Sequence, residues 1–312
     1  MDENDLRKAE VSRLPSIVKL SVVITSNNST SDVDRCLITL QQERKIEGIE
    51  IVVADSRSDD SLQEVITKYP EVVFIRFPGK TSLPVLWGAG IALSKGEVIA
   101  ITDSTCVADA HWIAAILKAH ESNHAVIGGA VESAQGKNMV EWAAYFCEYG
   151  QFIQPLLEGP ANVLPGNNIS FKRSTLTKGQ EFVQNGFWKT SWCRRLQEEG
   201  IQLVSTPEIV IYDNKSYHLI PFLIRRFHHG RCFAGMRISR ESRLKRASYV
   251  LASLLLPFLF VARTTSAIIS KRRHLNQFIL SLPISLLAIL VWSAGELCGY
   301  LTGTGESCAY TC

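Results

Sequence analysis

Short apolar runs alternate with amphipathic stretches along the first third of the chain. The expected strands, which are rich in β-branched residues, cover Val18–Thr25, Ile49–Ala54, Val72–Arg76 and Val98–Thr102. The expected helices, which place apolar residues on one face, cover approximately 32–44, 61–69 and 85–93. Strands that alternate with helices in this way predict a mostly parallel sheet with helices on its faces, which is the α/β fold class.

The last of these strands ends at a carboxylate. Val98–Thr102 is uncharged and mostly apolar, as expected of a strand that is buried on both faces, and Asp103 follows it directly. In an open α/β sheet the ligand-binding crevice lies at the carboxyl ends of the strands. Two interpretations of Asp103 are open: it binds a divalent cation that holds a diphosphate, or it caps a helix that begins near Asp109.

Composition narrows the class of protein. The 312 residues are 46% hydrophobic and 20% charged, which gives room for one large α/β domain and an appendage. The net charge of +3 gives no reason to expect a nucleic-acid partner. Residues 1–8 are polar and do not resemble a signal peptide. The eight cysteines have no zinc-type spacing, so we expect most of them to be reduced, as on the cytosolic side of a membrane.

The turn after the first strand differs from that of a dinucleotide-binding protein. It reads Ser26-Asn27-Asn28-Ser29, whereas a dinucleotide-binding Rossmann domain has Gly-x-Gly-x-x-Gly at this place. The absence of glycine counts against a dehydrogenase. It also lacks the glycine- and basic-rich loop expected of a nucleotidyltransferase.

Four blocks of sequence resemble one known family. The blocks are Leu20–Asn28, Glu50–Asp60, Gly96–Asp103 and Leu164–Arg173. Their order and spacing resemble the family 2 glycosyltransferases, which have the GT-A fold and use nucleotide-diphosphate sugars. The resemblance implies a three-layer GT-A domain with a mostly parallel sheet over residues 17–237. A polar lead-in, residues 1–16, precedes that domain, and a basic segment with two apolar membrane helices, residues 238–312, follows it.

The resemblance implies where the donor binds. Asn27 belongs to the first motif, and Asp55 stands where the family's acidic residue contacts the uracil or ribose, for which a carboxylate is a suitable acceptor. Capping of the next helix is the alternative role of Asp55. Asp103 stands at the metal-and-diphosphate motif, usually Asp-x-Asp, in which Thr105 replaces the second carboxylate. We therefore expect Mg²⁺ or Mn²⁺ to be held by Asp103, the donor phosphates and water.

The acceptor side is implied by a turn and an aromatic residue. Gly166, Asn167 and Asn168 resemble the acceptor-side turn, with a plain turn before a strand as the alternative. Trp188 resembles the aromatic residue at the start of a late helix, which a catalytic carboxylate follows in inverting members of the family.

The position of that carboxylate is the main departure from the family. Lys189 and Thr190 occupy the expected acidic places, and a lysine with an ordinary pKa is protonated and cannot act as a base. Either Asp213 or Glu181 provides the base, or the protein binds a sugar nucleotide without efficient transfer.

A basic segment follows the last expected strand. Arg225, Arg226, His229 and Arg231 resemble the family's late His-Gly-Arg segment, and Arg225 to Arg246 holds eight basic residues beside one acidic residue. These side chains neutralise the donor phosphates or, in the alternative interpretation, bind anionic lipid headgroups.

Two apolar segments predict membrane association. Residues 247–262 are uncharged, as are residues 275–295, and the second segment is long enough to cross a bilayer. Residues 254–260 have little left to pack against, although buried core helices are the alternative. The basic loop Lys271–Arg273 leaves open whether the hairpin spans the membrane or is re-entrant.

The sequence thus predicts an enzyme at the cell membrane with its catalytic domain facing the cytoplasm. It would transfer a sugar from a nucleotide-diphosphate donor to a lipid-linked or polysaccharide acceptor, in one inverting displacement. The alternatives are a non-catalytic sugar-nucleotide-binding protein of the same fold and a nucleotidyltransferase.

Overall fold

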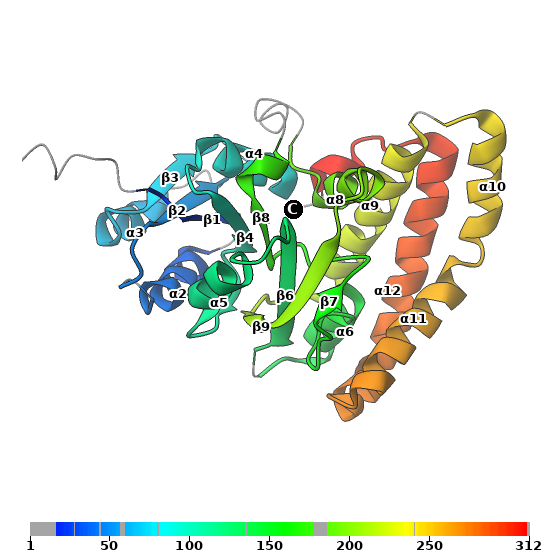
Figure 1. The fold of residues 1–312 in the computed structure, drawn as a ribbon. Coiled ribbons are helices and arrows are strands. Elements are labelled where there is room, and N and C mark those ends of the chain that lie inside the picture. Colours follow the sequence, from blue (N-terminus) through cyan, green and yellow to red (C-terminus); the bar gives the residue numbers. More distant parts are fainter. Residues whose placement is uncertain are drawn as a thin grey trace, which may run out of the picture.

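A mixed sheet of nine strands lies at the centre of the described part of the chain (Figure 1). The computed structural model describes residues 17–310 except 28, 44, 57–59, 80, 135, 177–185 and 240. The strands are β1 Leu20–Ser26, β2 Ile49–Asp55, β3 Val73–Arg76, β4 Val98–Asp103, β5 Cys106–Ala108, β6 Val126–Ser133, β7 Gly159–Pro160, β8 Ile169–Lys172 and β9 Leu203–Asp213. Their order is β3-β2-β1-β4-β8-β6-β9-β5, and β7 pairs with β9. The first four strands in this order are parallel, and β8 is antiparallel to β4 and β6, so the expected α/β class is confirmed.

Helices cover both faces of the sheet. They are α2 Thr30–Gln41, α3 Gln63–Lys68, α4 Leu83–Leu93, α5 Trp112–Ala119, α6 Met139–Tyr149, α8 Lys189–Glu198, α9 Leu219–Ile238, α10 Arg243–Ser253, α11 Leu256–Lys271 and α12 Leu275–Thr302. Short 3₁₀ turns are η1 Asp60–Leu62, η2 Arg173–Thr175 and η3 Ser307–Tyr310. The helix expected over 61–69 is therefore a 3₁₀ turn followed by a short α-helix.

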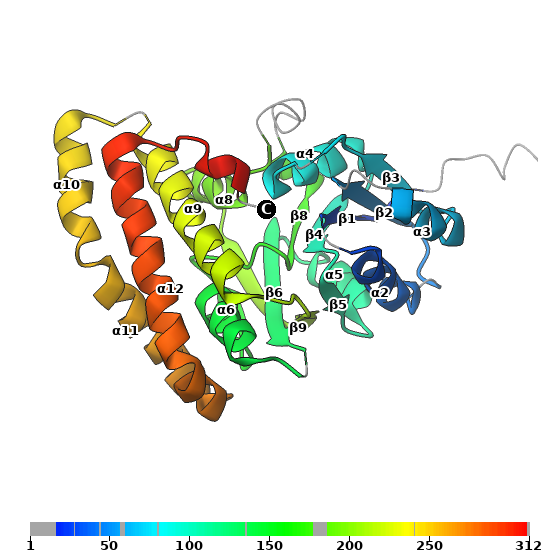
Figure 2. The ribbon, with the colours of Figure 1, turned by 180° about the vertical axis from the view of Figure 1, so that it is seen from behind.

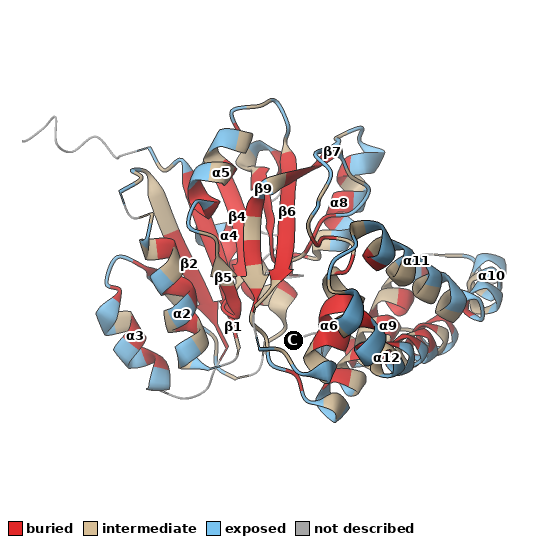
Figure 3. Cartoon of the chain, turned by 90° about the horizontal axis from the view of Figure 1, so that it is seen from below, coloured by how far each residue is buried: buried red, intermediate tan, exposed pale blue. Residues whose placement is uncertain are grey.

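The central strands are buried from both sides, as their uninterrupted apolar sequences require (Figure 3). Successive side chains of a strand point to opposite faces. Val22 and Ile24 accordingly join the core cluster that contains residues of α2, α5 and α6, whereas Val23 joins the cluster beneath α4 and α8. The sheet and its two helical layers form the expected three-layer arrangement.

The C-terminal helices pack on one side of this sandwich, with α12 alongside α9 and α6 (Figures 1 and 2). Glycines permit the close approach: a Cβ at Gly230 would lie 2.4 Å from Trp292 O, and one at Gly295 would lie 2.2 Å from Phe227 O. Phe278 of α12 also belongs to the core cluster that contains β1. The expected boundary at residue 237 falls one residue before the end of α9, and α12 packs against α9 and α6.

The two apolar segments differ in their surroundings. Helices α10 and α11 are bent by 57° at a short break, and Leu254, Leu255, Phe258 and Leu259 around this break are 60–73% exposed, as expected for residues with little to pack against. Helix α12 has 28 residues and contains an 18-residue window with a mean hydropathy of 2.1, so its length and composition suffice to cross a membrane. Among the described residues, α12 is the one unbroken helix that is long and apolar enough to cross a membrane.

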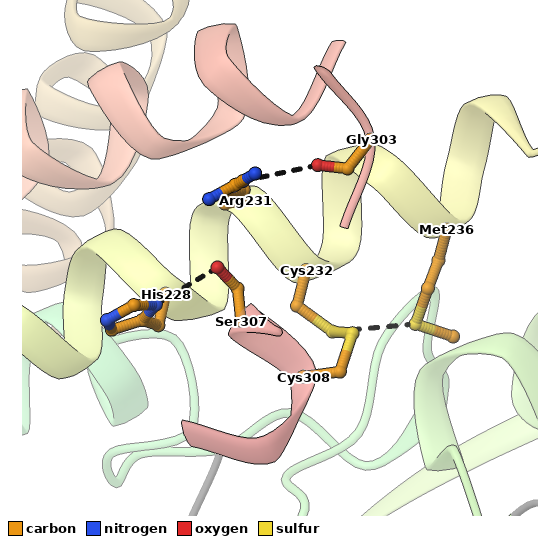
Figure 4. Close-up of a disulfide and its surroundings, with 7 residues drawn as sticks. All are labelled: His228, Arg231, Cys232, Met236, Gly303, Ser307 and Cys308. Carbon is orange, nitrogen blue, oxygen red and sulfur yellow. Dashed lines mark hydrogen bonds between the residues drawn. A yellow bond between two sulfur atoms is a disulfide. The ribbon is translucent and has the colours of Figure 1, made fainter. Parts of the chain in front are cut away.

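A disulfide between Cys232 and Cys308 joins η3 to α9 (Figure 4). It is an exception to the expected reduced state. The other five described cysteines are free: Cys36, Cys106, Cys147, Cys193 and Cys298.

Candidate active site

The predicted donor residues end strands at one edge of the sheet. Asp55 at the end of β2 pairs with Ser26 of β1, and Asp103 at the end of β4 pairs with Thr25 of the same strand. β1 therefore lies between the two carboxylates. This edge is where ligands bind to open α/β sheets, because the carboxyl ends of parallel strands meet there.

Asp103 does not cap a helix. Helix α5 begins at Trp112 with His111 as its N-cap residue, and the Asp103 carboxylate instead accepts a hydrogen bond from Thr25 Oγ1 at 2.7 Å. Burial raises the pKa of Asp103, and the nearby ammonium group of Lys215 opposes that rise. Of the two interpretations of this residue, the capping role is ruled out by the position of α5.

Asp103 faces a small pocket of about 120 Å³, here called the Asp103 pocket. Its walls come from α4, β4, the end of α6, the turn before β8, the segment after β9, and α9. The lining residues are Leu83, Trp87, Asp103, Glu148, Tyr149, Gly166, Asn167, Lys215, Arg225 and His229. The pocket thus brings the predicted metal-binding residue together with the predicted acceptor turn and part of the basic helix.

Opposite charges are balanced in this pocket. Arg225 Nη2 donates to Glu148 Oε1 at 3.2 Å, and Tyr217 donates to the other oxygen at 2.9 Å. Although burial alone would raise it, Arg225 and Lys215 hold the pKa of Glu148 at about 2. Burial and Arg225 lower the pKa of Lys215. Asp103 and Glu148 therefore face two cations, Lys215 and Arg225.

His229 adds a neutral polar group to the pocket. Burial, together with Arg225, lowers the pKa of His229 to about 3. Its imidazole is therefore uncharged at neutral pH, so one ring nitrogen can donate a hydrogen bond and the other can accept one.

Two residues of the acceptor turn, Gly166 and Asn167, line the pocket, and Asn168 does not. Asn167 Nδ2 donates to Tyr149 Oη at 3.0 Å. Asn168 instead accepts from Trp112 Nε1 at 2.9 Å and donates to the carbonyls of Ala130 and Ile209. The Asn168 amide holds the turn against the sheet, so its side chain is not available to an acceptor.

Lys189 and Trp188 lie where α8 begins. Lys189 is the first residue of the helix, and its buried Nζ donates to Leu164 O at 2.6 Å, beside the acceptor turn. Burial lowers the pKa of Lys189. Trp188 is the N-cap residue and meets Phe233 of α9 edge to face. The first turn of α8 contains no acidic residue.

Asp213 forms a buried ion pair at the end of β9. Its Oδ2 lies 3.0 Å from Lys137 Nζ, and the two side chains are 1% and 4% exposed. Burial raises the pKa of Asp213, which Lys137 opposes, and its Oδ1 has no hydrogen-bond partner among the described residues. Asp213 does not line the Asp103 pocket, although Lys215, two residues later, does. Glu181, the other proposed base, lies outside the described residues.

The remaining predicted donor residues lie away from the pocket lining. Asn27 is partly exposed directly after β1, and Asp55 is fully buried. Arg231 points toward the C-terminal segment, where its Nε donates to Gly303 O at 3.2 Å (Figure 4). The physical reason is helical periodicity: Arg225 and His229 are four residues apart and share one face of α9, whereas Arg231 lies on another.

Sequence reasoning missed Glu148, Tyr149, Trp87 and Lys215. The one local sign was Glu148 itself, a single carboxylate that follows the apolar run 142–147. Its partner Arg225 is 77 residues away in the sequence, so the pairing is visible only in the fold.

The side chains at this site can coordinate a metal ion only if a bound sugar nucleotide supplies further oxygen atoms. No group of three His, Cys, Asp or Glu side chains that could hold a metal occurs within the residues that the structure describes. The oxygen Asp103 Oδ1 is engaged by Thr25, which leaves Oδ2 to coordinate. One carboxylate oxygen with diphosphate oxygens and water is a coordination that Mg²⁺ accepts, so the residues fit a metal that binds with its donor.

Comparison with known proteins agrees with the geometry. The chain is 27% identical over 115 residues to the uncharacterized glycosyltransferase YfnE of Bacillus subtilis, covering 35% of this chain and 29% of that protein. It is 29% identical over 106 residues to the validoxylamine A glucosyltransferase of Streptomyces hygroscopicus, covering 32% and 25%. The matched regions thus span under a third of the length of either relative.

A solved structure shares the fold over nearly the whole chain. It is the mannosyltransferase PcManGT from Pyrobaculum calidifontis in complex with GDP-Man and Mn²⁺, with a TM-score of 0.54 and 14% identity. The match covers 94% of this chain and 93% of the other, which establishes the GT-A fold. The model of glycosyl transferase family 2 matches residues 21–178, slightly more than half of the 312 residues. On this match and this fold, the chain belongs to glycosyl transferase family 2.

Proposed function

We propose that this protein transfers a sugar from a nucleotide-diphosphate donor to a lipid-linked or polysaccharide acceptor at a membrane, in one inverting displacement. The observation that carries the proposal is the Asp103 pocket. It joins a carboxylate at the end of β4, the cations Lys215 and Arg225, and the turn at Gly166. A diphosphate group and a sugar require this combination of charges and polar backbone.

Asp103 is proposed to bind the donor diphosphate through Mg²⁺ or Mn²⁺. Two carboxylates already balance two cations in the pocket, so the diphosphate would bring negative charge that the side chains do not offset. A bound divalent cation would offset this negative charge and would stabilise the leaving diphosphate. The mannosyltransferase of the same fold, which is in complex with GDP-Man and Mn²⁺, supports this assignment.

Donor contacts are proposed for residues around the same edge. Asp55 and Asn27, at the ends of strands beside Asp103, would lie toward the nucleoside, while His229 would donate to a phosphate oxygen. Gly166, Asn167 and Trp188 would lie toward the acceptor, since Lys189, which follows Trp188, donates to Leu164 O just before the turn.

Asp213 is the proposed base for a hydroxyl acceptor, because one of its oxygens lacks a partner. A second candidate function is sugar-nucleotide binding without efficient transfer. The ammonium group of Lys189 at the start of α8, where a carboxylate would serve a hydroxyl acceptor, favours it.

Membrane association is proposed through α10, α11 and α12. The exposed apolar residues around the break between α10 and α11 would enter the bilayer interface, and α12 adds a helix of sufficient length. We place the catalytic domain on the cytoplasmic side of a cell membrane. Five described cysteines are free, as in a reducing compartment, and the Cys232–Cys308 disulfide is the exception.

The test is donor cleavage by the purified full chain across a panel of UDP-, GDP- and dTDP-sugars, with Mg²⁺ or Mn²⁺. We expect one nucleotide diphosphate to be released from one preferred donor, at a rate that rises when a membrane fraction supplies the acceptor. Donor binding without release would favour the second candidate. Absence of both binding and release across the panel would contradict the proposal.

A further inference from the structure

One whole face of helix α12 packs against the catalytic part of the molecule. The buried residues of α12 recur every three or four positions from Phe278 to Tyr300, which is the spacing of one helix face. This face contacts α6 and α9, as Figures 1 and 2 show. The same two helices contribute Glu148 and Arg225 to the Asp103 pocket. Helix α12 is therefore built into the layer that forms the candidate active site.

The packed face also holds the one charge of α12. Glu296 is the single charged residue in the sequence of this helix, and it is 3% exposed. Its carboxylate accepts hydrogen bonds from Trp292 Nε1 and Tyr300 Oη, both at 2.8 Å, and lies 3.3 Å from Arg237 Nη1 of α9. Protein thus surrounds the polar side of α12, and lipid can reach only the opposite side.

Both ends of α12 are attached to the catalytic part as well. Before the first turn, Arg273 Nη1 lies 2.9 Å from Glu132 Oε1 in the central strand β6. After the last turn, Arg231 Nε of α9 donates to Gly303 O at 3.2 Å, and the disulfide described above joins η3 to α9. A helix that crosses a bilayer separates its ends by about 30 Å of hydrocarbon, so only one end can lie on the side of the catalytic part. The contacts at both ends therefore contradict a crossing, although α12 is long enough for one.

The outward side of the C-terminal helices is apolar. More than half of the exposed large apolar side chains among the described residues lie between Leu244 and Leu301. Phe258 and Ile269 of α11 line one open groove together with Leu290 of α12, so the outward sides of both helices form one continuous surface. A continuous exposed apolar surface marks a place of contact with another molecule or with a membrane.

The charge of this surface identifies an anionic bilayer as its partner. From Arg243 to Leu280 the sequence contains seven basic residues and no acidic one. Arg263 and Arg272 in this stretch are exposed. Apolar side chains with basic neighbours match a leaflet in which anionic headgroups lie above the hydrocarbon. A second copy of this chain would instead place the same positive charge opposite, which is unfavourable.

We propose that α10, α11 and α12 form a monotopic membrane surface, which enters one leaflet of an anionic bilayer and does not cross it. Both ends of α12 and the hairpin at Lys271–Arg273 stay on the side of the catalytic part. This topology, which rests on the membrane association proposed above, keeps the basic hairpin on the cytoplasmic side, where basic loops are favoured. A pair of crossing helices would carry the hairpin to the outer side.

Labelling of single added cysteines tests the topology. Arg272→Cys places a reporter at the exposed hairpin, and Thr67→Cys places one on the exposed side of α3 as the matched control for the catalytic part. The full chain is expressed in bacterial cells and treated with a membrane-impermeant maleimide, and the wild type gives the background because it has free cysteines. We expect both variants to be labelled in inverted vesicles, whose cytoplasmic side faces outward, and neither in intact spheroplasts.

Three other labelling patterns have distinct meanings. Opposite sidedness of the two reporters would overturn the proposal, because α12 would then cross the membrane. Labelling of Arg272→Cys only after detergent is added would place the hairpin inside the bilayer and would also overturn it. Labelling of both reporters in spheroplasts and not in inverted vesicles would support the monotopic surface and contradict the cytoplasmic side.

Vesicle binding by the purified full chain tests the charge of the surface. We expect at least about tenfold tighter binding to phosphatidylcholine vesicles that contain phosphatidylglycerol than to phosphatidylcholine alone. Arg272→Gln should bind the anionic vesicles about fivefold more weakly and the neutral vesicles as the wild type does. Lys95→Gln, which removes an exposed charge between α4 and β4, is the matched control and should bind both kinds of vesicle as the wild type does.

Equal binding to both kinds of vesicle, or equal binding of Arg272→Gln and wild type to anionic vesicles, would contradict the anionic partner. A dimer in detergent-free solution that binds no vesicles would assign the surface to a second copy. Donor cleavage together with opposite sidedness of the reporters would overturn only the monotopic surface and leave the proposed function standing. Vesicle binding with the expected sidedness, but without donor binding or release, would leave the surface standing and contradict the proposed function.

Discussion

Lys189 places a positive charge at the start of α8. Its Nζ donates to Leu164 O, and burial lowers the pKa of the ammonium group. The amino-terminal end of a helix carries a partial positive charge, so a cation there is unfavourable and a carboxylate would be favourable. The residue thus has the opposite charge from the one that would remove a proton from a hydroxyl acceptor or from water.

Replacing Lys189 by a carboxylate should therefore create a base. We expect Lys189→Glu to hydrolyse the donor about 10²-fold faster than the wild type, because positioned bases typically contribute 10²–10⁴-fold. Release of nucleotide diphosphate with water as the acceptor measures this rate.

Lys189→Gln is the control, because it removes the charge without adding a proton acceptor. An equal gain in both variants would assign the effect to charge rather than to base catalysis. Asp213→Asn tests the rival position: rapid hydrolysis by the wild type that is lost in Asp213→Asn would place the base at residue 213.

The role of a single residue could be predicted where the neighbouring sequence indicates it. Asp103 follows an uninterrupted apolar run, and the end of a buried strand is a recognisable place for a ligand-binding carboxylate. Glu148 acquires its importance from Lys215 and Arg225, which lie far from it in the sequence. Asn168 belonged to a motif that suggested an acceptor contact, but its buried amide bonds are satisfied by α5 and two strands.

At the scale of elements, the length of the apolar segments predicted that C-terminal helices form, but it did not predict how these helices pack. Helices α9 and α12 approach closely because Gly230 and Gly295 lack side chains at their contact. Gly295 begins a Gly-x-x-x-Gly pattern with Gly299, which is typical of close helix contacts, but the pattern does not identify α9 as the partner helix. Apolar residues of α12 therefore lie on two sides of the helix. One side packs against α9 and α6, and the other exposes residues such as Ile279 and Leu290.

Helix α11 exposes apolar side chains that should bind a bilayer. Phe258 is 73% and Leu259 is 60% exposed, so the protein core gains little from either. We expect the double variant Phe258→Ser/Leu259→Ser to lose at least about tenfold in partition into phosphatidylcholine–phosphatidylglycerol vesicles, because each buried side chain contributes roughly 1.5–3 kcal/mol. Co-sedimentation measures the partition, and the melting temperature should not change.

Ile38→Ser is the control for that variant. Ile38 is 47% exposed on α2, on the catalytic part of the molecule, so its loss should leave vesicle binding unchanged. Undiminished binding of the α11 variant would show that this helix is not the membrane contact. A fall in its melting temperature would instead show that the two side chains stabilise the fold.

At the scale of the whole molecule, the parallel half of the sheet was predictable and the other half was not. Regular alternation of strands and helices predicts that β1 to β4 are parallel, because each helix returns the chain to the same edge of the sheet. It does not predict that β4 lies beside β1 rather than beside β3. The order β4-β8-β6-β9 depends on contacts between residues far apart in the sequence, such as the pairing of Val98 with Lys172. That second half supplies the acceptor turn and Lys215, which complete the Asp103 pocket.

The central claim is that Asp103 and a divalent cation hold the donor diphosphate at the end of β4. The most direct measurement is calorimetric binding of the nucleotide diphosphate of the preferred donor to wild type and Asp103→Asn, with Mn²⁺ and with chelator. Asp109→Asn, which changes a carboxylate outside the pocket, is the matched control. We expect wild type and control to bind at least about tenfold more tightly with Mn²⁺, and Asp103→Asn to bind weakly under both conditions. Equal affinities of Asp103→Asn and wild type, with Mn²⁺ and with chelator, would contradict the claim.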